Sequence, residues 1–197
     1  KVKIEKAATK VPYADMDGDS AYRSALRLAE EGVLIGEQVG GTYYFHPDAL
    51  VSRDQFVALA MHTVGLEALE GVTITGFADD AAIPTWAKGY VSSALKSGLV
   101  QGTVSEAGVV FEGERPITKA EASVLLDRML QVTDASVTTL FPDLDTTPAW
   151  AYQAAVNLET VGVLQTAADG SLGLSDTLTR ADAADMLCGA LELLEAR

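Results

Sequence analysis

Three basic side chains recur at equivalent places in this sequence, each directly after a serine or threonine: Arg53, Lys119 and Arg180. Together with a Gln, Glu or Asp three residues further on, the hydroxyl matches or approaches a capping box, which marks a helix start. A cation is disfavoured in a first helical turn, so capping leaves the basic residue unexplained. A bound carboxylate would explain it, because free N–H groups and a neighbouring cation both attract an anion. The plainer interpretation is three solvated surface cations.

Two tryptophans and two glycines are further candidates for ligand contact. Trp86 and Trp150 each open a predicted helix, where an indole either packs in the core or offers a flat face on which a sugar ring stacks. Gly36 and Gly102 each follow a helix end by four residues. A position without a side chain lets a ligand approach the backbone, although turn geometry explains a glycine equally well.

Three aspartates, Asp15, Asp79 and Asp143, each stand just before a predicted helix and close an aromatic-x-Asp segment. Capping or loop hydrogen bonding is the structural interpretation of such a residue. Recognition of sugar hydroxyls is the functional one. The sequence favours the structural role but keeps the three among the candidate binding residues.

The predicted elements that carry these side chains recur three times along the sequence. The aromatic-x-Asp segments lie 64 residues apart. Each is followed by a helical stretch that ends in glycine, a loop with one apolar residue, and a second helix that opens at the basic residue. The helix-ending glycines are Gly32, Gly98 and Gly162, and the loop residues are Phe45, Phe111 and Leu172. Apolar residues spaced as Trp86, Val91, Ala94 and Leu95 predict the buried stripe of a first helix.

One such unit is too small to bury its apolar faces alone, so three must share a core. We therefore expect a mainly α fold, in which three helix-loop-helix repeats pack as a pseudo-threefold helical bundle with grooves between repeats. The predicted repeats span residues 11–70, 71–134 and 135–197. Residues 1–10 alternate apolar and charged, which suits a short strand or the tail of a preceding domain.

Composition limits the possible partners. The chain has 197 residues, 48% of them hydrophobic, and a formal net charge of −14, which argues against binding nucleic acid or an anionic membrane. No apolar run is long enough to insert into a membrane. The chain reads as a processed piece, so the absence of an export signal does not argue against secretion. The single cysteine, Cys188, lies in an apolar helical run and suits a small buried hydrophobe.

Three other functions compete. Asp15-x-Asp17-x-Asp19 imitates the start of a calcium loop, but Ser20 and Leu26 stand where that loop needs Gly and Glu, so no metal is expected. Scattered carboxylates and two isolated histidines, His46 and His62, give no catalytic constellation, so we predict no enzyme and no cofactor. Self-association in a surface lattice without glycan binding stays open as the alternative.

In their fixed order, these motifs resemble those of the S-layer homology family. The resemblance rests on the aromatic-x-Asp starts, Trp86-Ala87 and Trp150-Ala151, the spacing of Gly98 and Gly102, and Ile117 to Glu121. It covers about Val11 to Leu194. It implies a three-pronged, pseudo-trimeric helical module that anchors a bacterial surface protein non-covalently to the cell wall or S-layer, outside the cell.

The partner implied by the resemblance is an anionic secondary cell-wall polysaccharide, commonly ending in pyruvylated N-acetylmannosamine. The family's basic residue falls on Arg53, Lys119 and Arg180, and its tryptophan falls on Trp86 and Trp150. The first copy has Ser20 in the tryptophan position, and the third has Thr166 in the position of Gly36 and Gly102. Lysine also lacks the planar fork of arginine. Unequal sites are therefore expected.

Overall fold

A computed structural model describes residues 12–136 and 141–197. The strand or tail predicted for residues 1–10 lies outside the described residues. The described part is rich in helix, with two small antiparallel sheets. Its helices and strands are α1 (Tyr22–Glu30), β1 (Glu37–Val39), β2 (Thr42–Tyr44), α2 (Arg53–Thr63), α3 (Thr85–Lys96), β3 (Thr103–Ser105), β4 (Gly108–Val110), α4 (Lys119–Leu130), α5 (Ala149–Thr160) and α6 (Arg180–Glu195). Short 3₁₀ turns at Asp80–Ala82 and Leu144–Thr146 precede α3 and α5.

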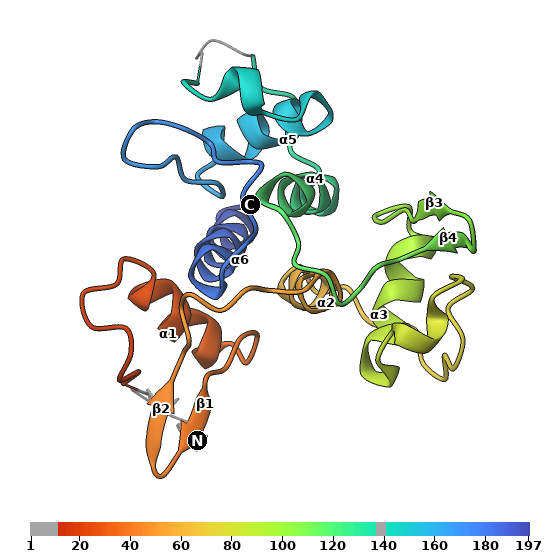
Figure 1. Ribbon diagram of the computed structural model, residues 1–197. Coiled ribbons are helices and arrows are strands. Elements are labelled where there is room, and N and C mark those ends of the chain that lie inside the picture. Colours follow the sequence, from red (N-terminus) through yellow and green to blue (C-terminus); the bar gives the residue numbers. More distant parts are fainter. Residues whose placement is uncertain (1–11, 137–140) are drawn as a thin grey trace.

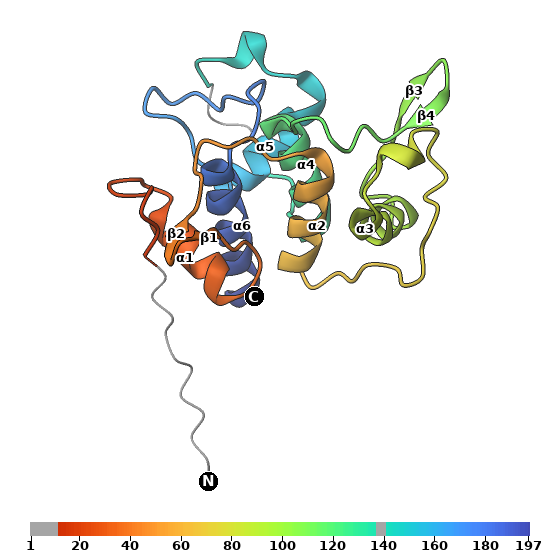
Figure 2. The same cartoon turned by 60° about the horizontal axis from the view of Figure 1, so that its bottom comes forward.

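Three helices, α2, α4 and α6, form the centre, and three lobes surround them (Figure 1). One lobe holds α1 with the β1–β2 hairpin, the second holds α3 with β3–β4, and the third holds α5 with a long loop. Each outer helix packs on the central helix that belongs to a different predicted repeat: α1 on α6, α3 on α2 and α5 on α4. Figure 2 shows the β3–β4 hairpin projecting from the body. No predicted repeat therefore buries its first helix by itself.

A ring of backbone hydrogen bonds ties the starts of the central helices together. The Val51 N–H donates to the Leu178 carbonyl at 3.0 Å, the Leu178 N–H to Ile117 at 2.8 Å, and the Ile117 N–H to Val51 at 3.0 Å. The three side chains are buried. The ring therefore takes one segment from each of the three predicted repeats.

The local signals read from the sequence correspond to the structure. Capping boxes begin α2, α4 and α6 as predicted. The three helix-ending glycines all have φ near +70 to +80°, the left-handed conformation that glycine adopts without strain. The loop residues Phe45, Phe111 and Leu172 are almost completely buried, and Cys188 is buried, as expected. Apolar plugs therefore fix each loop beside a helix start.

The predicted apolar stripe of the outer helices is wrong at its ends. Trp86 is 53% exposed and Leu95 is also exposed, whereas Ala87, Val91 and Ala94 are buried. Trp150 is likewise 63% exposed. The stripe is one residue out of phase at the helix start, because close packing of α3 and α5 on a central helix requires the small alanine there. Both indoles consequently face outward.

No helix within the described ranges combines the length and the apolar character needed to cross a membrane.

Candidate functional site

The first turns of the central helices do not offer free N–H groups to an anion, which corrects that part of the prediction. The N–H groups of Arg53 and Lys119 donate to carbonyls of the next repeat's loop at 2.9 Å each, and that of Arg180 does so at 2.8 Å. The N–H groups of the following residues, Asp54, Ala120 and Ala181, donate in the same way. Any anion at these sites must therefore be held by side chains.

Arg53 lines a groove of about 230 Å³ that also contains Gln101, Glu121, Arg128 and the exposed Trp150. We call it the Arg53 groove. Its residues come from all three predicted repeats, because α2 supplies the arginine, α4 the acid and α5 the indole. Side chains far apart in the sequence are thus brought together around one hollow.

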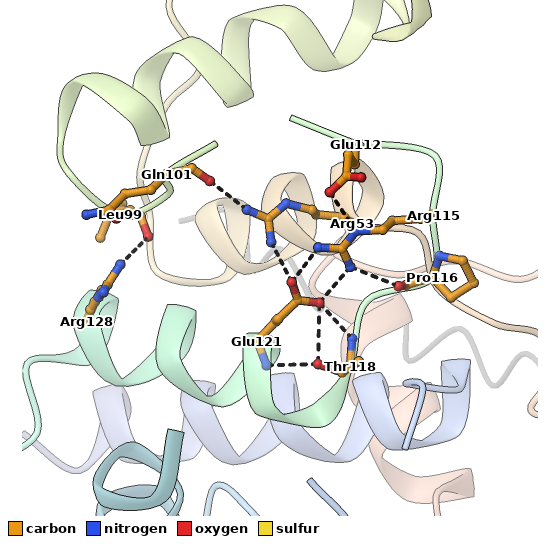
Figure 3. Close-up of polar contacts among 9 residues, drawn as sticks. All are labelled: Arg53, Leu99, Gln101, Glu112, Arg115, Pro116, Thr118, Glu121 and Arg128. Atoms are coloured by element: carbon orange, nitrogen blue, oxygen red, sulfur yellow. Dashed lines mark hydrogen bonds and ion pairs between the residues drawn. The ribbon is translucent and has the colours of Figure 1, made fainter. Parts of the chain in front are cut away.

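Within this groove the Arg53 guanidinium is already engaged (Figure 3). It donates to Glu121 Oε1 at 3.1 Å and to the Gln101 carbonyl at 3.0 Å. The guanidinium also lies over the Phe111 ring, 5.0 Å from its centre. Arg115 donates to both oxygens of the same carboxylate, at 2.8 and 2.5 Å. A carboxylate of the chain itself, that of Glu121, therefore already pairs with Arg53.

Burial and neighbouring charges shift the pKa values of Arg53 and Glu121 in opposite directions. Burial lowers the pKa of Arg53, and the nearby charge of Glu121 opposes that shift. Burial works to raise the pKa of Glu121, but the hydrogen bond from Arg115 and the N–H of Thr118 outweigh it, so the pKa is lowered. Both groups are therefore charged at neutral pH, and the ion pair is maintained.

Arg180 lines a second groove, of about 210 Å³, together with Leu34, Gln55, Leu59 and Trp86. We call it the Arg180 groove. The guanidinium donates from Nε to the Phe45 carbonyl at 2.8 Å and from Nη2 to the Ile35 carbonyl at 3.3 Å, and it lies 4.8 Å from the Phe45 ring centre. Burial lowers the pKa of Arg180, while Tyr13 and Asp15 act in the other direction. A cation and an exposed indole thus line the same hollow.

The Lys119 site differs from the other two. Lys119 Nζ pairs with Asp182 Oδ1 at 3.0 Å, and the hollow beside it, lined also by Gln165 and Asp185, measures about 40 Å³. An adjoining pocket contains Ser24 and Glu192, and neither hollow is lined by a tryptophan. The site is therefore small and acidic, which disfavours an anion.

The three predicted aspartates do not line these grooves; each organises a loop. Asp15 accepts from the N–H groups of Phe45 and His46 at 2.8 and 2.7 Å. Asp79 and Asp143 hold the corresponding pairs, Phe111 with Glu112 and Leu172 with Gly173, at 2.8 to 3.0 Å. The second residue of each pair has φ near +60°, so each carboxylate fills a nest of two successive N–H groups.

Gly36 and Gly102 also have internal reasons to lack a side chain. A Cβ at Gly36 would lie 2.3 Å from the Tyr13 ring, and one at Gly102 would lie 2.4 Å from Val109 Cγ1 and 2.7 Å from the Phe77 ring. The close approach is therefore to the chain's own aromatic residue and not to a groove.

The competing metal site finds no support in its geometry. The Asp15 carboxylate accepts the two loop N–H groups, whereas Asp19 Oδ1 accepts from the Ala21 N–H at 2.8 Å, so the two carboxylates serve different backbone segments. Among residues 12–136 and 141–197, no cluster of three or more His, Cys, Asp or Glu is placed to hold a metal ion.

A family comparison adds independent information. The S-layer homology domain family matches residues 76–123, which hold α3, the β3–β4 hairpin and the capping box of α4. Residues 76–123 are thus an S-layer homology domain. The match includes Trp86 and Lys119, and it ends just after Glu121.

Three curated relatives are similar to this chain. The surface-layer 125 kDa protein of Lysinibacillus sphaericus is 26% identical over 126 residues, which is 64% of this chain. Exoglucanase XynX of Acetivibrio thermocellus is 26% identical over 65% of the chain, and the amylopullulanase of Thermoanaerobacterium thermosulfurigenes is 27% identical over 60%. The matched region covers 10%, 12% and 6% of the length of these three relatives, in that order. The chain therefore spans only a small part of each of them.

Proposed function

We propose that this chain is a non-covalent cell-wall anchor, composed of three S-layer homology repeats related by a pseudo-threefold axis. The chain resembles a small part of a surface-layer protein, of an exoglucanase and of an amylopullulanase, and residues 76–123 match the S-layer homology domain. A module that recurs in proteins with such different names fits a shared attachment function better than a single shared catalytic reaction. The cyclic packing of the outer helices on the central ones supports the threefold relation. The site of action is accordingly the outer cell surface, in the cell wall or S-layer.

The ligand is an acidic cell-wall polysaccharide, and a pyruvylated secondary cell-wall polymer fits the grooves best. The observation that carries this proposal is the pairing of a guanidinium with an exposed indole in one hollow, as Arg180 pairs with Trp86 and Arg53 with Trp150. A ketal carboxylate on a sugar ring requires both partners: a cation for the carboxylate and a flat apolar face for the ring. The chain's charge of −14 means that the anion must be captured locally, inside a groove.

Calorimetry at fixed salt tests the proposal with purified, protein-free wall glycan, with and without its pyruvyl groups. We expect the wild-type chain to bind only the pyruvylated glycan, and Trp86→Ala to weaken that binding. Equal binding to both glycans would overturn the carboxylate assignment. Absence of binding, together with concentration-dependent oligomers in the absence of glycan, would make self-assembly the better account.

A further inference from the structure

The three basic residues form a repeating pattern of ion pairs that is broken once. Arg53 of α2 pairs with Glu121, the third residue of α4, at 3.1 Å, and Lys119 of α4 pairs with Asp182, the third residue of α6, at 3.0 Å. At the equivalent junction between α6 and α2, the first residue of α6 is Arg180 and the third residue of α2 is Gln55. A neutral amide thus stands where the other two sites have a carboxylate.

Arg180 is consequently a cation without an ion-pair partner in the part of the chain that the structure describes. Within residues 12–136 and 141–197, no carboxylate oxygen lies within 4.0 Å of its guanidinium. Its two hydrogen bonds go to neutral carbonyls, which orient the guanidinium without cancelling its charge. Gln55 is exposed and uses its Oε1 to accept from the Ser52 N–H at 3.2 Å, which leaves its amide nitrogen free of the cap. Gln55 lines the groove, and its amide nitrogen is a hydrogen-bond donor, whereas a glutamate side chain would have only acceptors.

Resting on the proposed function, we propose that Gln55 determines which groove binds, so that the Arg180 groove is the principal carboxylate site and the Arg53 groove is closed by its own Glu121. A ligand carboxylate can approach Arg180 directly. At Arg53 it must first displace an internal carboxylate that also accepts from Arg115 and from the Thr118 N–H. The acidic surroundings of Lys119 make the third site the weakest.

Two nearly isosteric substitutions test this without disturbing the helix starts, because Gln and Glu both serve as the reaching-back residue of a capping box. Gln55→Glu should place a carboxylate beside Arg180 and weaken binding about threefold to fivefold, as expected for one competing ion pair at an exposed position. Gln131→Glu, which adds the same charge at the exposed end of α4, is the matched control and should leave binding unchanged.

The reverse change should open a closed groove. In an Arg180→Ala background, where the principal site is disabled, Glu121→Gln should free Arg53 and raise the remaining affinity about tenfold. A purely structural role for Glu121 could not produce that gain. The probe is a methyl glycoside of pyruvylated N-acetylmannosamine, measured by calorimetry beside its unpyruvylated counterpart.

The outcomes separate the two proposals. Weaker binding by Gln55→Glu and a gain from Glu121→Gln support the inference. Unchanged binding by Gln55→Glu, while Arg53→Ala abolishes binding, would overturn it and leave the wall-anchor function intact. A wild-type chain that binds neither glycoside nor glycan would overturn both.

Discussion

Arg53 Nη1 lies 3.1 Å from Glu121 Oε1, and this contact joins the first turns of α2 and α4. The side chains are only 13% and 18% exposed, so the pair is well shielded from solvent. Its counterpart from α4 to α6 is Lys119 with Asp182, and its counterpart from α6 to α2 is absent from the described ion pairs. Two of three equivalent helix junctions are therefore held by charge, whereas the third has an unneutralised arginine.

This asymmetry predicts a difference in coupling energies. A double-mutant cycle of Arg53→Ala with Glu121→Gln should give a coupling of about 1 to 2 kcal/mol in the free energy of unfolding, because the pair is partly buried and hydrogen-bonded. The equivalent cycle of Arg180→Ala with Gln55→Ala should give a value near zero. Urea unfolding followed by circular dichroism measures both. Equal couplings would show that charge does not distinguish the two junctions.

The outward position of the tryptophans predicts that binding and stability respond separately. Trp150→Ala should cost about 1 kcal/mol or less, because most of the indole is exposed. Leu158→Ala on the same helix should cost about 2 to 5 kcal/mol, because that side chain is fully buried. Urea titrations provide the comparison. A large loss of stability from Trp150→Ala would indicate that the indole supports the fold.

Features that depend on a few neighbouring residues could be predicted from the sequence. The capping boxes, the left-handed glycines and the buried plugs belong to this class, because each is fixed by local backbone chemistry. The sequence also placed Arg53 and Arg180 correctly at helix starts. Their neighbours could not be predicted, because Glu121 is 68 residues from Arg53 and the Ile35 carbonyl is 145 residues from Arg180.

Other features lacked a sequence signal of their own. Periodicity indicated an apolar stripe through Trp86. It could not show that Ala87, and not Trp86, is the residue buried where α3 packs on α2. Asn157 of α5 is polar, yet it is fully buried, donates to Asp127 at 3.0 Å and Asp134 at 3.2 Å, and accepts from the Ala135 N–H at 2.9 Å. Its place among alanine and aliphatic residues, between Val156 and Leu158, was the hint that the sequence offered.

Two glycines should respond differently to alanine. Gly102→Ala should destabilise the chain by about 1 to 3 kcal/mol, because the new methyl would overlap Val109 and Phe77. Gly32→Ala meets no atom within 4 Å, but its φ of +71° disfavours a side chain, so a cost of about 1 kcal/mol is expected. Thermal unfolding distinguishes the two. A tolerated Gly102→Ala that loses glycan binding would instead favour the ligand-contact role predicted from the sequence.

Acid should weaken the segment that precedes α3. The hydrogen bond from Lys88, together with the Thr75 N–H and hydroxyl, lowers the pKa of Asp80 to about 2. A depressed carboxylate pKa stabilises the fold above the unfolded pKa of about 4, and that contribution is lost as pH falls toward 2. Asp80→Asn should therefore flatten the fall in unfolding free energy between about pH 4 and 2. An unchanged slope would contradict the assignment.

The loop-organising role of the aspartates is tested at Asp79. Asp79→Ala removes the acceptor for the N–H groups of Phe111 and Glu112, and should cost about 1 to 3 kcal/mol, with faster hydrogen exchange at both amides. Asp79→Asn keeps one carbonyl acceptor and should lie between that variant and wild type. Asp17→Ala, at an exposed position, is the control and should change little. The plug residue Phe111 lies against the Arg53 guanidinium. Loosening this loop should therefore also disorder the side chains that line the Arg53 groove. Full stability in Asp79→Ala combined with lost glycan binding would restore the sugar-contact role for this aspartate.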